Sequence, residues 1–391
     1  MIRLLPFVFS AALLGCTTDV PERPTEAELP PSYEPRGADA AGFQLTQYGD
    51  LQLKTWYPAI GDGSATLDYD VALKFPGFPE DPVAIHGTAI ADAPVAEGGP
   101  YPLVVLSHGF GLNPEWYHDL AEHLATHGFV VVAPEHLEAD WFADVIDATA
   151  SRPSEVSAAI DFADAHEGGW VDTDRVAVLG HSYGGYTALA SAGARIDPSS
   201  LAERCEAATD RMMQAYFCDS FVGQEQALAS ALGLDSVPDG LWPAAGDPRV
   251  DSVVSIAGDA YLFGEDGLAA VQVPVMAIGG TADTGTPWTW GSQLTYDAVG
   301  SDDRALVGLE GAEHMVVTAS CDDMPFTQAM PPEYAGYFCE DPAWDKAGAH
   351  DVIHHLTTAW LKHTLQGDAE AEASLAPELY DDVDGLLMMV E

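Results

Sequence analysis

The stretch VAVLGHSYGG, residues 176–185, sets one serine among three glycines directly after an apolar run. Glycine adds no side-chain packing and loses much conformational freedom on folding, so such a cluster is a poor way to build a core. An apolar strand, then Gly-x-Ser-x-Gly, then small residues at 186–190 is typical of a nucleophile elbow, a strained turn that lifts a serine hydroxyl above a sheet. We therefore predict that Ser182 is a nucleophile and that Gly180 and Gly184 lie where backbone segments approach closely.

A serine hydroxyl needs a base to take its proton and an acid to orient that base. Asp283 follows the apolar run 275–278 in the turn GGTAD, and His314 follows the run 305–309 in the turn GAEH. Both turns would lie at the sheet edge that carries the elbow, and the chain order Ser, Asp, His accompanies such elbows. We predict that Asp283 orients His314 and that His314 deprotonates Ser182. The alternative at each position is a solvated loop residue.

Hydrolysis through a serine also needs donors for a tetrahedral oxyanion. The sequence SHGFG, residues 107–111, follows the apolar run 103–106, which is the position of the oxyanion loop in proteins with this elbow. We predict that the backbone N–H groups of Phe110 and Tyr183 form the oxyanion hole.

Five apolar runs indicate buried strands, at residues 103–106, 129–132, 176–179, 250–256 and 275–278. Continuous apolar strands separated by amphipathic stretches are typical of a parallel sheet covered on both faces. We predict an α/β fold over residues 41–366, with a hairpin at 43–48 and 51–57 and a helix at 153–166. Residues 195–248 interrupt the pattern and are either a lid-like insertion or a surface elaboration.

Several stretches resemble known α/β-hydrolases: YPLVVLSHGFG (101–111), LATHGFVVVAPEH (124–136), DTDRVAVLGHSYGG (172–185), GTAD (280–283) and GAEH (311–314). The similar proteins are platelet-activating-factor acetylhydrolase, bacterial polyester hydrolases and chlorophyllase-like "dienelactone hydrolases". The resemblance covers most of residues 43–366 and implies the α/β-hydrolase fold and carboxylic-ester hydrolysis without a cofactor. True dienelactone hydrolases use cysteine where this chain has Ser182. In the acetylhydrolase the acid follows the preceding strand, which makes Asp259 the rival to Asp283.

The first residues indicate export, because Arg3 precedes an apolar stretch, residues 4–14, that is too short to span a bilayer. The sequence LLGC at 13–16 resembles the lipobox of bacterial lipoproteins. We expect a signal peptide at 1–15, lipidation of Cys16 and a Pro-rich, acidic tether over 16–40. The lipid would hold the protein at the bacterial cell envelope, and we favour the outer membrane or the surface over the inner membrane. The alternative is an ordinary cleaved signal with an incidental cysteine.

The remaining cysteines are even in number, which in an exported chain favours disulfides with three possible connectivities. The four are Cys205, Cys218, Cys321 and Cys339. We expect the near-neighbour pairs, because each would close one local loop. His350 and His354 share a helix face and could bind a metal, but no third ligand is evident, so we expect a surface helix and no metal.

The formal net charge is −48, from 14 basic and 62 acidic residues. Such a surface argues against binding nucleic acid or anionic lipid by charge, and it is typical of solvation in salty surroundings. We expect residues 367–391 to be an acidic tail, and no obligate protein partner is evident.

The sequence therefore predicts a serine ester hydrolase that acts through an acyl-enzyme on a small, lipid-like or polyester substrate. The alternatives are an amide or peptide hydrolase with the same triad, and an inactive envelope binding protein on the same scaffold. Seven side chains flank the predicted catalytic turns and either line a substrate pocket or pack in the core: Phe110, Trp141, Phe142, Tyr183, Trp288, Trp290 and Met315.

Overall fold

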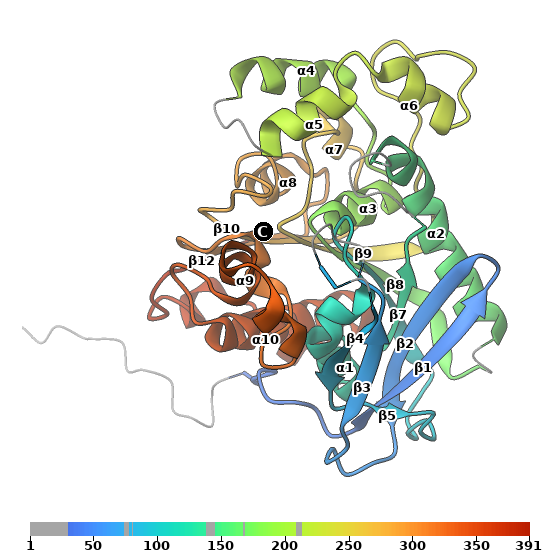
Figure 1. The fold of residues 1–391 in the computed structure, drawn as a ribbon, viewed down its shortest axis with the longest axis vertical. Helices are drawn as coiled ribbons and strands as arrows, with labels where there is room; N and C mark the ends of the chain where they lie inside the picture. The colour runs from blue at the N-terminus through green and yellow to red at the C-terminus, as the bar shows by residue number, and fades with distance from the viewer. Residues whose placement is uncertain (1–29, 74–77, 80, 138–144, 167–168, 209–212) are drawn as a thin grey trace, which may run out of the picture.

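A mostly parallel sheet lies between two layers of helices, as the sequence predicts (Figure 1). The computed structural model describes residues 30–73, 78–79, 81–137, 145–166, 169–208 and 213–391. The expected signal peptide and Cys16 lie outside the described residues, and the lipid anchor stays a prediction. No helix among the described residues is long and apolar enough to cross a membrane.

Within the described part of the chain, the central sheet has ten strands in the order β12-β11-β10-β9-β8-β6-β7-β2-β1-β5. Neighbours from β7 to β11 run parallel, while β2, β1 and β12 add antiparallel pairs at the two sides. The sheet strands are β1 (Ala40–Tyr48), β2 (Leu51–Ala59), β5 (Ile90–Ala91), β6 (Tyr101–Ser107), β7 (Val130–Glu135), β8 (Val171–His181), β9 (Val250–Ile256), β10 (Val275–Gly280), β11 (Arg304–Leu309) and β12 (Leu386–Val390); β3 (Leu67–Val71) and β4 (Val83–Gly87) pair separately.

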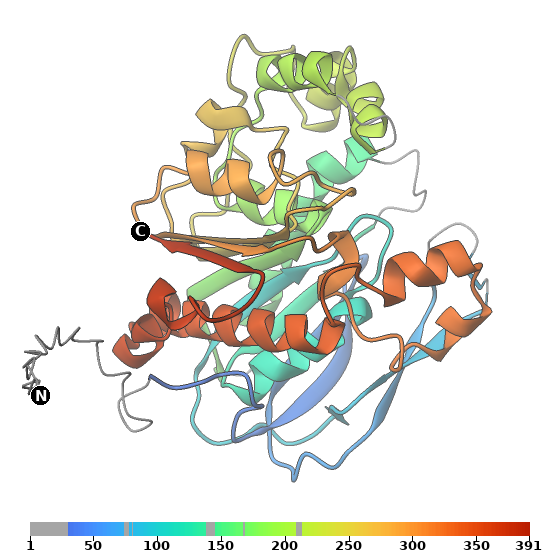
Figure 2. The same cartoon turned by 90° about the vertical axis from the view of Figure 1, so that its left-hand side faces the viewer.

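The helices divide between the two faces of this sheet (Figure 2). Alternate strand residues point to opposite faces, so Val104 and Leu106 pack under α1 and α10 while Leu103 and Val105 pack under α2 and α3. The helices are η1 (Pro114–Tyr117), α1 (His118–Thr126), α2 (Val145–His166), α3 (Tyr183–Ser191), α4 (Pro198–Ala207), α5 (Met213–Phe221), α6 (Glu225–Ala231), α7 (Gly264–Leu268), α8 (Ser292–Ala298), η2 (His314–Val317), η3 (Pro325–Ala329), α9 (Pro332–Cys339), α10 (Lys346–Gln366), α11 (Ala369–Ala373) and η4 (Pro377–Leu379).

The predicted insertion contains α4, α5 and α6, which lie together beyond α7 at the top of Figure 1. Leu201, Phe217 and Leu228 bury their side chains in the core on the α2 and α3 face. The insertion is therefore packed on the domain through its own apolar residues.

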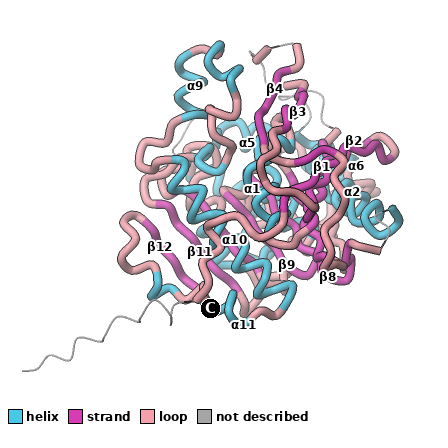
Figure 3. The backbone as a smooth tube through the Cα atoms, turned by 90° about the horizontal axis from the view of Figure 1, so that it is seen from below, coloured by secondary structure: helices cyan, strands magenta, loops and turns pink. Residues whose placement is uncertain are grey.

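The last residues do not form the free acidic tail that we expected. Residues 386–390 form β12, which pairs antiparallel with β11 along the edge of the sheet (Figure 3). The apolar run LLMMV supplies the strand, and the side chains of Leu386, Met388 and Val390 pack against the core. The end of the expected tether is also folded, because Tyr33 is buried beside His355 of α10 and its N–H donates to that ring.

Candidate active site

Ser182 stands at the turn between β8 and α3, as predicted for a nucleophile elbow. Its φ of 56° and ψ of −121° lie outside the regions that non-glycine residues normally adopt. The neighbouring structure holds this strained turn, since the Ser182 N–H donates to the carbonyl of Ile256 and the Ser182 carbonyl accepts from Asp259 N–H. A strained strand-to-helix turn of this kind is the one expected to lift a serine hydroxyl above the sheet.

The glycines around Ser182 are required by close backbone approaches, as predicted. A Cβ at Gly180 would lie 2.0 Å from the carbonyl oxygen of Gly184, and a Cβ at Gly184 would lie 1.9 Å from the carbonyl oxygen of Ser107. These distances are far inside van der Waals contact. Gly184 thus lets the helix after the elbow pack directly against the end of β6, where the oxyanion loop begins.

The structure brings Ser182, His314 and Asp283 into one hydrogen-bonded chain. His314 follows β11 and begins η2, while Asp283 follows β10. His314 Nε2 lies 2.9 Å from Ser182 Oγ, and His314 Nδ1 lies 2.9 Å from Asp283 Oδ2. Since a carboxylate accepts, Nδ1 carries the proton and Nε2 is left to accept the hydroxyl proton of Ser182.

Two carboxylates set the protonation of this histidine. Burial lowers the pKa of His314, but the charge and hydrogen bond of Asp283, with a further contribution from Asp259, leave the pKa raised above its usual value. His314 is buried, yet its partner Ser182 is only half-buried. The base is therefore shielded while the hydroxyl stays accessible to a substrate.

The rival acid Asp259 does not contact the imidazole through any hydrogen bond in the described structure. Its Oδ1 accepts from the hydroxyl of Thr286, and its buried Oδ2 has no partner among the described residues. Thr286 also donates its backbone N–H to Asp283 Oδ1 at 2.8 Å, so it connects the two carboxyl groups. Burial raises the pKa of Asp259 to about 7.

The predicted oxyanion loop lies beside the elbow. Phe110 follows β6, and its ring packs edge-on against the ring of Tyr183, with centroids 5.6 Å apart. Tyr183 is the first residue of α3, where a backbone N–H has no acceptor within its own helix. The Tyr183 side chain is fully buried, and its hydroxyl bonds Thr149 and the carbonyl of Val145 on α2. The oxyanion roles of both residues stay predictions.

Sequence reasoning missed the buried groups that hold this loop. The guanidinium of Arg152 on α2 is fully buried and donates to the carbonyl of His108 at 2.7 Å. His136 bonds Ser107 Oγ through Nε2 at 2.7 Å and Glu155 through Nδ1 at 2.6 Å. His136 lies 29 positions from Ser107 and Arg152 lies 44 positions from His108, so no local spacing in the sequence links them to the loop.

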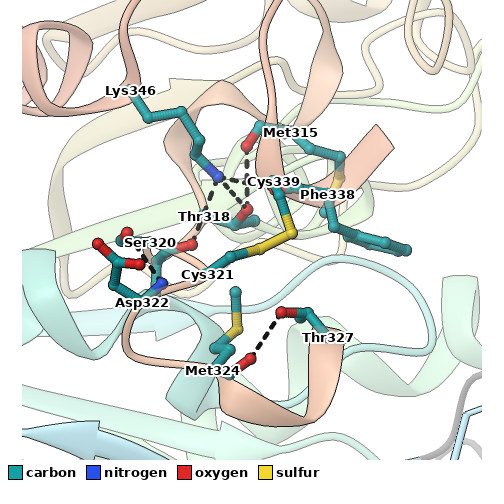
Figure 4. Close-up of a disulfide and its surroundings, with 11 residues drawn as sticks. Met315, Thr318, Ser320, Cys321, Asp322, Met324, Thr327, Phe338, Cys339 and Lys346 are labelled. Atoms are coloured by element: carbon teal, nitrogen blue, oxygen red, sulfur yellow. Dashed lines mark hydrogen bonds between the residues drawn. A yellow bond between two sulfur atoms is a disulfide. The ribbon is translucent and has the colours of Figure 1, made fainter. Parts of the chain in front are cut away.

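Both expected disulfides are confirmed, Cys205 with Cys218 and Cys321 with Cys339. The first links α4 to α5. The second ties α9 to the segment after η2, and buried Lys346 donates across the same region to Thr318 and to the carbonyl of Phe338 (Figure 4). Desolvation lowers the pKa of Lys346 to about 7. The segment just after His314 is thus fixed by a disulfide and by hydrogen bonds from a buried lysine.

The other residues that we singled out in the sequence differ in burial. Trp290 and Met315 are buried, Trp288 is half-buried against β10 and β11, and Trp141 and Phe142 lie outside the described residues. The surface position expected for His350 and His354 is wrong: both are buried, and their ring nitrogens lie 3.3 and 3.5 Å from Asp119 of α1. Among the described residues, no group of three or more His, Cys, Asp and Glu side chains is arranged to hold a metal ion.

The similarity to known proteins covers the segment that contains the oxyanion loop and Ser182. Residues 81–202 match the Chlorophyllase family model. The chain is 35% identical over 144 residues to Chlorophyllase-1 of Arabidopsis thaliana, covering 31% of this chain and 40% of the relative. It is 31% identical over 104 residues to the chloroplastic Chlorophyllase-1 of Citrus unshiu, covering 24% of this chain and 30% of the relative.

The chain spans well under half the length of these relatives, and the family match ends before Asp283 and His314. The matched segment does contain the oxyanion loop and the elbow with Ser182. The sheet order and the elbow give the chain the α/β-hydrolase fold, and over residues 81–202 it is similar to the chlorophyllases.

Proposed function

We propose that this protein hydrolyses carboxylic esters through an acyl-enzyme on Ser182. The observation that carries the proposal is the hydrogen-bonded chain from Ser182 Oγ to His314 and on to Asp283, at 2.9 Å for each step. An isolated serine is a weak nucleophile at neutral pH, and this arrangement is the one that activates it.

The reaction would proceed in two halves. His314 takes the hydroxyl proton as Ser182 Oγ attacks the ester carbonyl, and the backbone N–H groups of Phe110 and Tyr183 stabilise the oxyanion. His314 then gives that proton to the leaving alcohol, which departs as the acyl-enzyme forms. In the second half a water molecule loses a proton to His314 and attacks the acyl carbonyl; the bond to Ser182 Oγ then breaks, His314 returns the proton to that oxygen, and the acid is released.

The relatives support ester hydrolysis as the reaction class. They are named chlorophyllases, and the segment they share with this chain includes Ser182 and the oxyanion loop. The proposal for this chain is the reaction class alone, because pocket-lining residues downstream of 202 lie outside the matched family segment.

A fluorophosphonate probe tests this proposal, because it reacts with activated serines only. The folded wild type should be labelled at Ser182, and Ser182→Ala should not be labelled. Turnover of p-nitrophenyl esters from acetate to palmitate, and of a polyester film, should accompany labelling and disappear in Ser182→Ala. Turnover of an anilide but not of the matching ester would favour the amide hydrolase. A folded wild type that resists the probe would instead favour the binding protein.

A further inference from the structure

Three hydrogen bonds connect the oxyanion loop to the backbone of the proposed base. The N–H of Gly109 lies 3.1 Å from Tyr117 Oη, Tyr117 Oη lies 2.7 Å from His181 Nδ1, and His181 Nε2 lies 3.0 Å from the carbonyl oxygen of His314. Each end of this chain belongs to a different strand end of the sheet. Tyr117 ends η1, and His181 is the residue immediately before the nucleophile.

The direction of every bond follows from the chemistry of the groups. The carbonyl of His314 only accepts, so His181 carries a proton on Nε2. Burial first, and then the charge of His314, lower the pKa of His181 well below its usual value, so the ring is neutral and Nδ1 has no proton. Tyr117 must therefore donate to Nδ1, and its oxygen accepts the N–H of Gly109. No other assignment satisfies all three bonds.

The residues of this hydrogen-bonded chain are buried and closely packed. Tyr117 and His181 are 2% and 1% exposed, so water cannot replace a lost partner without opening the site. A Cβ at Gly109 would lie 3.0 Å from Tyr117 Oη and 3.4 Å from His181 Nδ1, which shows how closely the loop sits on the pair. The rings of Tyr117 and His181 also pack, with centroids 5.5 Å apart.

We propose that Tyr117 and His181 are positioning residues that fix the oxyanion loop and the backbone of His314 relative to each other. The inference rests on the proposed function and deepens it. Phe110 follows Gly109 directly, so the placement of Gly109 sets the placement of a predicted oxyanion donor. Such donors accelerate acyl transfer only when they are held in place before charge develops.

A merely structural role would give a different result, and the chain offers a matched control. Tyr186 is another fully buried tyrosine, and its hydroxyl donates one hydrogen bond, to the carbonyl of Thr149 at 2.9 Å. Tyr117→Phe and Tyr186→Phe therefore each remove one buried hydroxyl from the same domain. Tyr117→Phe should lower kcat about 10- to 100-fold with KM changed less than about threefold, because transition-state geometry is lost and substrate binding is kept. Tyr186→Phe should keep kcat within about threefold of the wild type.

The conservative variant at the second position gives a rescue test. Glutamine can accept from Tyr117 through its oxygen and donate to His314 through its nitrogen, whereas leucine can do neither. His181→Gln should keep kcat within about fivefold of the wild type, and His181→Leu should lose about 100-fold. The kcat of the double variant Tyr117→Phe/His181→Leu should lie within about threefold of the kcat of the less active single variant. The two losses should not multiply, because the two residues act as one unit.

Amide hydrogen exchange measures the coupling without reference to activity. Tyr117→Phe should speed exchange both in residues 107–112 and in the distant residues 312–317, and Tyr186→Phe should change neither. The positioning role is overturned if kcat of Tyr117→Phe matches that of Tyr186→Phe, if glutamine and leucine at 181 behave alike, or if exchange changes at 107–112 only. If the wild type resists the fluorophosphonate but Tyr117→Phe speeds exchange at both 107–112 and 312–317, the proposed reaction is wrong and the coupling between the two segments stands.

Discussion

Asp283 and Asp259 lie close to the same histidine, but of the two only Asp283 is hydrogen-bonded to it in the described structure. Asp283 accepts from His314 Nδ1, while Asp259 accepts from Thr286 through Oδ1, and its Oδ2 has no hydrogen-bond partner in the part of the chain that the structure describes. Replacing Asp283 with Asn leaves an amide that can drive the imidazole into the wrong tautomer. We expect Asp283→Asn to lower kcat about 10⁴-fold, as removal of an orienting carboxylate does in triads, and Asp259→Asn to lower kcat less than about tenfold.

The pH profile of the Asp259→Asn variant separates the two roles further. Ionised Asp259 raises the pKa of His314, but its own pKa of about 7 leaves it partly protonated across the acidic limb of kcat/KM, so Asp259→Asn should move that limb only slightly to lower pH, since the base must be neutral to act. The wild type and Asp283→Asn serve as the comparisons. A loss of about 10⁴-fold in Asp259→Asn with an active Asp283→Asn would make Asp259 the acid and reverse our assignment.

At the scale of residues, the sequence predicts the parts of the site that belong to short, contiguous motifs. Ser182, Gly180 and Gly184 belong to one short motif, and His314 follows a strand whose end had to share the elbow's edge. The choice between Asp283 and Asp259 and the contact between Tyr117 and His181 depend on the packing of segments far apart in the chain. Spacing along the sequence carries no record of those distances.

The packing of α1 against α10 brings histidines into the core. His123 of α1 is 1% exposed, its Nε2 has no hydrogen-bond partner among the described residues, and its ring stacks on His354 of α10 with centroids 4.5 Å apart. The other groups that act electrostatically on these two rings are Asp119, His127, His350 and Arg36. Burial lowers the pKa of His123 to about 2 and that of His354 to about 4.

This interface should make the fold sensitive to acid. The folded pKa of His123 lies below the unfolded value of about 6.5, so the unfolded chain binds the proton first as pH falls. Its contribution to stability is full above pH 6.5 and declines below it, by about 2–3 kcal/mol between pH 6.5 and 4.5. His123→Leu should remove that part of the decline, measured as the free energy of unfolding in urea at both pH values.

His86 provides the comparison for this experiment, because it is an exposed histidine beside Asp68 on the small β3–β4 sheet. His86→Leu should leave the acid-dependent decline within about 1 kcal/mol of the wild type. If His123→Leu keeps the full decline, the buried histidines do not set the acid limit of this fold.

At the scale of elements, regular patterns predict well and terminal segments do not. The hairpin at 43–57 and the parallel strands were predicted because their apolar runs are long and bounded by turn residues. The helix expected at 153–166 begins earlier, at Val145, and contains Pro153. β12 was missed because five apolar residues after an acidic stretch gain strand structure only by pairing with β11.

The whole molecule carries a net charge of −48, and the groups next to the site add to it locally. Glu313 precedes His314 and is held by Thr284, and Asp341 accepts the N–H of Glu313. The nearest described cation on the loop side, Arg152, is buried beneath the loop and bonded to its carbonyls. A negative field of this size repels anions and weakens with salt.

This field should discriminate between esters by charge. At 0.01 M salt, kcat/KM for p-nitrophenyl hemisuccinate should be well below that for the uncharged butyrate, because the anion approaches a negative surface. Raising NaCl to 1 M shortens the screening length from about 30 Å to about 3 Å and should raise kcat/KM for the hemisuccinate about tenfold, while the butyrate changes less than about twofold. The uncharged ester controls for any effect of salt on the protein itself. An equal response of the two esters would mean that the charge of the molecule acts on its solvation and not on its choice of substrate.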